Sequence, residues 1–141
     1  MKKTITILIT SILLSSFATI KANAKTTNIS EEIVGIWAMH PLKNGIANVV
    51  DIRENGETIL HPFNCETRSN EKPESSTYSI KDEKYIEIGS GENAQTLEIV
   101  EINENSMTLR QSTGDYSLSF KYKKIDEINP MCELYYLYKN R

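Results

Sequence analysis

Apolar and polar residues alternate with a period of two along much of this chain. In the segment 116–123, Ser and Lys occupy one face, and the other face carries Tyr116, Leu118, Phe120 and Tyr122. This alternation is typical of a β-strand with one buried and one solvated side. Residues 107–110 alternate in the same way. The pattern predicts an all-β protein, and we expect its core to contain Leu109, Leu118 and Phe120.

Turn signals divide the chain into extended segments at a spacing of about ten residues. The expected strands cover 35–39, 46–53, 58–65, 77–80, 85–88, 96–102, 107–111 and 116–123. A polar stretch at 66–76 reads as the longest exposed loop. One short helical turn is expected at 28–34, where Asn28 and Ser30 can cap a helix ahead of two Glu residues. About eight strands at this spacing favour an antiparallel up-and-down meander closed into a barrel or a sandwich.

Three local signals refine this picture. Asn55-Gly56 between two extended segments predicts a tight hairpin. Pro62 cannot donate a hydrogen bond to a sheet, so it indicates an edge position or a bulge. The apolar positions change parity between Ile99 and Val100, which predicts a bulge at that point.

The first 24 residues differ in composition from the rest. They begin with two lysines, continue with an apolar segment at 4–20 and end with Ala22-Asn23-Ala24. This is the three-part pattern of a secretory signal peptide. We expect cleavage after residue 24, leaving 25–141 as one barrel domain that a bacterium exports to its periplasm or secretes, with no remaining transmembrane span. The alternative is an uncleaved anchor, but an apolar run of about 17 residues is at the short limit for a bilayer.

Charge excludes one class of partner. Three of the 16 basic residues lie in 1–24, so 25–141 carry 13 basic and 19 acidic side chains, a formal charge of −6. No basic stripe interrupts this acidic chain. It would repel a phosphate backbone, so we expect no nucleic-acid binding.

Candidate catalytic groups are few. His40 and His61 each stand directly before a proline, and the chain has no Gly-x-Ser-x-Gly or His-Glu-x-x-His motif. Paired carboxylates such as Glu31-Glu32 lie beside polar neighbours, where solvation is the expected state. A glycosidase-like pair drawn from separate strands stays an alternative. We expect a non-catalytic protein with no cofactor and no metal.

Cys65 and Cys132 are the two cysteines of the chain. In an oxidising compartment, two cysteines favour one disulfide. It would close a loop of roughly 65 residues, worth about 4 kcal/mol in the chain-entropy model. A metal site with His40 or His61 and a pair of free thiols are the alternatives. The disulfide is favoured over metal because His61 and Cys65 form only an isolated pair.

The segment Ile33-Val34-Gly35-Ile36-Trp37, after a short helical turn, resembles the Gly-x-Trp motif at the start of lipocalin-like domains. The Asn-Gly hairpin and the last strands, at 99–110 and 116–122, extend this resemblance over most of 30–125. It implies an eight-stranded up-and-down barrel in which Gly35 and Trp37 are structural and Trp37 closes one end. Many lipocalins also tie a mid-barrel strand to the C-terminal segment by a disulfide, and Cys65 with Cys132 fits that arrangement.

The resemblance implies a carrier that holds a small hydrophobic or amphipathic ligand inside the barrel. The side chains we expect around such a ligand are His61, Phe63, Tyr78, Tyr116 and Phe120. The alternative is a protein-binding barrel, such as an inhibitor of lysozyme or an immunity protein against a toxin, for which the charge of −6 favours a basic partner. A carrier needs small or polar residues facing inward, whereas an inhibitor can have a filled core and a conspicuous exposed loop.

The C-terminal segment 134–138 is unusually aromatic. Anchored by Cys132, it is expected to add a further strand or to cover one end of the barrel. If it is exposed instead, it is a recognition patch, because tyrosine is favoured at interfaces.

Overall fold

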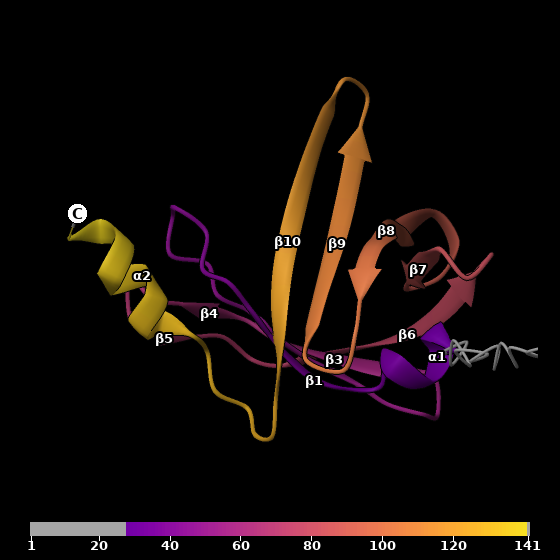
Figure 1. The fold of residues 1–141 in the computed structure, drawn as a ribbon, viewed down its shortest axis with the longest axis horizontal. Coiled ribbons are helices and arrows are strands. Elements are labelled where there is room, and N and C mark those ends of the chain that lie inside the picture. The colour runs from indigo at the N-terminus through magenta and orange to yellow at the C-terminus, as the bar shows by residue number, and fades with distance from the viewer. Residues whose placement is uncertain (1–27, 141) are drawn as a thin grey trace, which may run out of the picture.

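A computed structural model describes residues 28–140 of the chain. Within them, eight antiparallel strands form a closed barrel in the order β1-β10-β9-β8-β7-β6-β3-β2. This is the predicted all-β architecture, in which each strand follows its neighbour up and down around the barrel (Figure 1). The predicted signal peptide, 1–24, lies outside the described residues.

The barrel strands are β1 (Gly35–Met39), β2 (Val49–Ile52), β3 (Glu57–His61), β6 (Glu74–Lys81), β7 (Tyr85–Ile88), β8 (Gln95–Ile102), β9 (Ser106–Thr113) and β10 (Tyr116–Ile125). A second sheet joins β4 (Phe63–Asn64) to β5 (Ser69–Asn70). The helices are α1 (Ile29–Glu32), the 3₁₀ turn η1 (Gly91–Asn93) and α2 (Cys132–Lys139). The predicted loop 66–76 is wrong in part, because it contains β5 and the first residues of β6.

The predicted hairpin turn and the predicted bulge are both present. Gly56 has a φ of 81° between β2 and β3, a left-handed conformation that glycine adopts without a steric cost. The strand predicted at 58–65 is wrong in part, because it is divided at Pro62 into β3 of the barrel and β4 of the second sheet. The pairing of β8 with β9 shifts register between Ile99 and Glu101, which confirms the predicted bulge.

Trp37 joins α1 to the barrel. Its side chain is fully buried, and its indole Nε1 donates a hydrogen bond to the carbonyl of Ile33 at 2.8 Å. Lys124 covers the indole face, and its Nζ also donates to the carbonyl of Glu32 at 3.2 Å. Gly35 has a φ of 139°, and a Cβ there would collide with the Lys124 side chain. These residues close the barrel end at which α1 lies.

Large apolar side chains form the core of the barrel. Ile86, Met107 and Leu109 are buried in one cluster with Trp37, and Phe120 packs against it. The expectation that Leu118 lies in the core is wrong, because its side chain is 51% exposed. β1 pairs with β10 only over 122–125, so the outer part of the β9–β10 hairpin extends past the strand that would cover it.

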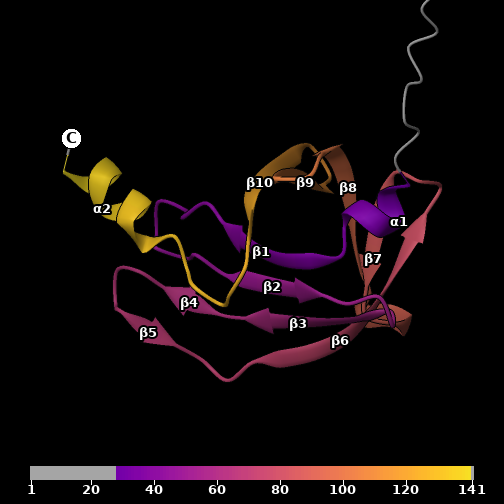
Figure 2. The same cartoon turned by 60° about the horizontal axis from the view of Figure 1, so that its bottom comes forward.

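The aromatic C-terminal segment forms the helix α2, not a further strand. Cys132, Tyr135, Tyr136 and Lys139 recur at the helical spacing of three and four residues, which places them on one face. Tyr135 is buried with Ala47 and Cys65 in a second, smaller core. Figures 1 and 2 show α2 beside the β4–β5 sheet, away from β7 and β8.

Candidate functional site

The five side chains expected around an interior ligand do not meet in one place. Tyr78 lies in β6, and its hydroxyl donates to the carbonyl of Arg53 at 2.9 Å, in the β2–β3 turn. Tyr116 lies at the tip of the β9–β10 hairpin and is 84% exposed. Of the five, Tyr78 and Phe120 pack against the same buried core cluster.

His61 ends β3 opposite Val49, and Phe63 lies in β4, beyond Pro62. Both are partly buried. Phe63 lines two shallow cavities outside the barrel, beside the β4–β5 sheet. Binding of a ligand by any of the five stays a prediction, but the interior around the buried core is occupied by large apolar side chains.

Four cavities of residues 28–140 open outside the barrel, around α2 and the β4–β5 sheet. A wide one of about 970 Å³ lies between the end of β10, the following segment and α2, and charged side chains such as Lys123, Asp126 and Glu133 line it. A second, of about 530 Å³, lies against α2 and has a more apolar lining. Its volume falls in the range of small-molecule sites, about 300–1,000 Å³.

We name this second cavity the α2 groove. The segment that follows β1 supplies one wall, and α2 supplies the other, with Glu66 between them. Its lining residues are Pro41, Leu42, Lys43, Glu66, Tyr135, Tyr138 and Lys139. Leu42 packs against the barrel core, whereas the Tyr138 side chain is 64% exposed. The groove therefore has an apolar floor and an aromatic side that faces solvent.

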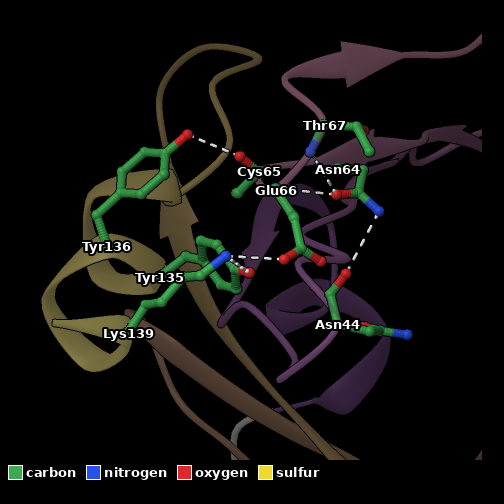
Figure 3. Close-up of polar contacts among 8 residues, drawn as sticks. All are labelled: Asn44, Asn64, Cys65, Glu66, Thr67, Tyr135, Tyr136 and Lys139. Atoms are coloured by element: carbon green, nitrogen blue, oxygen red, sulfur yellow. Dashed lines mark hydrogen bonds and ion pairs between the residues drawn. The ribbon is translucent and has the colours of Figure 1, made fainter. Parts of the chain in front are cut away.

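Three contacts attach the α2 wall to Cys65 and Glu66, which follow β4. Cys65 and Cys132 form the predicted disulfide. The Tyr136 hydroxyl donates to the carbonyl of Cys65 at 2.7 Å, and Lys139 Nζ donates to Glu66 Oε1 at 2.8 Å (Figure 3). Because these contacts lie at the beginning, middle and end of α2, the helix cannot move from the groove without breaking one of them.

The opposite wall is fixed by a tight turn. Gly45 N donates to the carbonyl of Leu42 at 2.9 Å, and the carbonyl of Gly45 accepts from Cys65 N at 2.8 Å. The Asn64 side chain donates to the carbonyl of Asn44 at 3.4 Å and accepts from the backbone N–H of Glu66 at 2.9 Å (Figure 3). Asn64, Cys65 and Glu66 thus bind both walls: the first two contact the turn at 42–45, and the last two contact α2.

Of the two lysines that line the groove, Lys139 has an acidic partner and Lys43 has none within residues 28–140. The Lys139 ammonium holds the pKa of Glu66 below its ordinary value, chiefly through their hydrogen bond. Lys43, also at the rim, forms no ion pair within residues 28–140. An apolar floor beside an ammonium group with no ion pair suits a molecule with an apolar body and an anionic end.

Sequence reasoning did not find this groove. The spacing of Cys132, Tyr135, Tyr136 and Lys139 was the signal that α2 is a helix. Nothing in the sequence placed Pro41 and Leu42 beside α2, because more than 90 residues separate these two segments along the chain.

The described residues hold no group of three or more His, Cys, Asp and Glu side chains placed to bind a metal ion. In residues 28–140, no helix is long and apolar enough to cross a membrane. Comparison of the chain with protein-family models, characterised proteins and solved structures found no match.

Proposed function

We propose that this chain is a non-catalytic, lipocalin-like binding protein of the bacterial cell envelope that binds a small amphipathic anion in the α2 groove. The observation that carries the proposal is the pairing of an apolar floor with Lys43 at the rim, in a cavity of about 530 Å³. The large apolar side chains buried inside the barrel favour a site outside it. Export is supported by the secretory pattern of 1–24 and by the disulfide.

Affinity would come from the apolar body, and selectivity from the charge. Contact with Leu42 and Tyr138 removes apolar surface from water, at roughly 25 cal/mol for each Å² buried. The Lys43 ammonium then favours a carboxylate over an alcohol of the same chain length. An exposed ion pair contributes little, about 0.2–1 kcal/mol, so we expect modest selectivity of a few-fold.

The test is calorimetric titration of the purified mature protein with dodecanoate, dodecanol and dodecyltrimethylammonium. We expect dodecanoate to bind most tightly. Tyr138→Ser should weaken its binding by about tenfold, through lost apolar contact. Lys43→Gln should remove the preference for dodecanoate over dodecanol and leave dodecanol binding unchanged.

Tyr116→Ser is the matched control, because it also removes an exposed tyrosine but lies at the tip of the β9–β10 hairpin. It should bind dodecanoate as the unchanged protein does. Absence of dodecanoate binding, or equal weakening by Tyr116→Ser and Tyr138→Ser, would overturn the proposal.

A second candidate function is protein binding, and the outer β9–β10 hairpin favours it. Tyr116 and Leu118 are 84% and 51% exposed there, and exposed apolar side chains of this size mark interaction surfaces. An inhibitor or immunity protein would contact its partner through this hairpin. Chemical crosslinking tests this candidate: a protein partner that binds the hairpin should be captured by a crosslinker at position 116 and not by one at position 138, in the α2 groove.

A further inference from the structure

The outer part of β10 has a strand neighbour on one side only. β10 pairs with β9 over 116–123, whereas β1 pairs with it only over 122–125. β1 ends at Met39, and Pro41 follows two residues later. Among the described residues, the edge of β10 at 116–120 is therefore unpaired, and Figure 1 shows this hairpin standing away from the rest of the barrel.

The backbone groups at this edge can be assigned from their neighbours. The carbonyl of Lys121 accepts from His40 N at 2.7 Å, on the β1 side, whereas Lys124 N donates at 2.9 Å to a carbonyl just before β9. Successive residues of an antiparallel strand direct their backbone groups to opposite sides. Ser117 and Ser119 therefore present both their N–H and C=O groups to the open edge.

This edge lacks the usual protection against strand addition. Natural edges carry lysine or proline, or are bent by a bulge. Here the edge-facing residues are the two serines, and the β9–β10 pairing is continuous. Tyr116 and Leu118 are exposed on the adjoining face. A strand of this kind is a template for another strand.

We propose that this edge pairs antiparallel with the same edge of a second copy of the chain, around a two-fold axis at Leu118. Ser117 would then face the partner's Ser119, and each such pair exchanges two backbone hydrogen bonds. The second strand would lie beside β10 at 116–120, in the position that the chain leaves after His40. This proposal does not depend on the α2 groove.

The side chains are complementary in this register. Residues opposite each other in an antiparallel pair have their side chains on the same face. Leu118 would meet its own copy, and Tyr116 would meet the partner's Phe120. The exposed apolar face of one hairpin would thus continue into that of the other.

Charge selects the register. Asp115 and Lys121 stand three residues on either side of Leu118, so each would lie at one end of the paired segment, near its opposite charge in the partner and, at Lys121, beside His40. A shift of two residues in either direction would place Lys121 opposite an uncharged residue, Ser117 or Thr113.

Sedimentation equilibrium of the mature protein over a range of concentrations tests the proposal. The contact is short, so we expect a weak, concentration-dependent dimer. Asp115→Lys and Lys121→Asp should each weaken it by roughly tenfold, since each variant alone sets like charges opposite one another. An equimolar mixture of the two variants should dimerise again, because every facing pair in the mixed dimer has opposite charges.

Ser119→Pro removes an edge-facing N–H and leaves the β9 hydrogen bonds intact, so it should also weaken the dimer. Tyr138→Ser is the control and should dimerise normally. A monomer at every concentration would overturn the proposal, as would a dimer that withstands Ser119→Pro and both charge variants. Failure of the mixture to recover would overturn the register. None of these outcomes bears on dodecanoate binding, so the proposed dimer and the proposed ligand site are tested independently of each other.

Discussion

The ammonium of Lys124 lies 4.9 Å from the ring centroid of Trp37, over the face of the buried indole. Lys124 belongs to the last barrel strand and Trp37 to the first, and the two face each other in the β1–β10 pairing. The contact therefore lies at the seam of the barrel, where the first and last strands pair. Its cation–π attraction is favoured by partial burial, which removes water from the ammonium group.

Trp37→Ala should destabilise the protein by about 3–5 kcal/mol, because it leaves a large cavity in the core and leaves the Ile33 carbonyl without its donor. Urea denaturation followed by circular dichroism measures this change. Tyr138→Ala, at an exposed tyrosine, should stay within about 0.5 kcal/mol of the unchanged protein. Equal midpoints for Trp37→Ala and the unchanged protein would show that Trp37 does not hold the barrel together.

Removal of the disulfide should separate α2 from the barrel. In Cys65→Ser/Cys132→Ser, the unfolded chain gains the freedom of a loop of roughly 65 residues, and we expect a loss approaching 4 kcal/mol. The double variant avoids a lone reactive thiol. Hydrogen exchange should show faster exchange in α2 than in β8 and β9. Uniform acceleration across all strands would instead place the disulfide in the cooperative unit of the barrel.

Glu66 should make stability depend on acid. Its pKa is lowered in the folded state, chiefly by the hydrogen bond from Lys139, so the pair stabilises the fold above the ordinary carboxyl pKa. That contribution is lost as the pH falls through the folded pKa. The Tm difference between the unchanged protein and Glu66→Gln should thus be larger at pH 7 than at about pH 3.

Both side chains of this pair are about half exposed, so the effect is small and screened by salt. Glu71→Gln is the control, since Glu71 has no ion pair in the described part of the chain. A Tm difference for Glu66→Gln that does not change with pH would contradict the prediction.

Gly45→Ala should weaken dodecanoate binding, whereas Gly114→Ala should not, although both variants should lower the Tm. Gly45 has a φ of 85°, and a Cβ there would lie 2.7 Å from Asn64 Oδ1 and 2.8 Å from the backbone N of Glu66. The groove wall would have to move, whereas the barrel core lies elsewhere. Gly114→Ala is matched, with a φ of 59° but open space around it. Thermal melting of both variants measures the backbone strain that they share. Titration with dodecanoate measures the displacement of the groove wall, which only Gly45→Ala should cause.

The sequence by itself determined most of the strands and turns from which the barrel is built. Strands such as β1 and β7 begin and end where the flanking turn signals predicted, because turn residues act over a few neighbours. The bulge near Ile99 and the hairpin at Gly56 were also local signals. The pairing of Cys65 with Cys132 followed from there being two cysteines in the chain.

Only the tertiary structure decided which faces are covered. Leu118 continues the alternation of Tyr122, but β1 ends before reaching it, so one is exposed and the other buried. The α2 groove likewise needs Leu42 and Tyr138 to line one cavity, and the disulfide holds α2 next to Cys65. Burial depends on what lies across from a side chain, and that neighbour comes from a distant segment whose position no local pattern records.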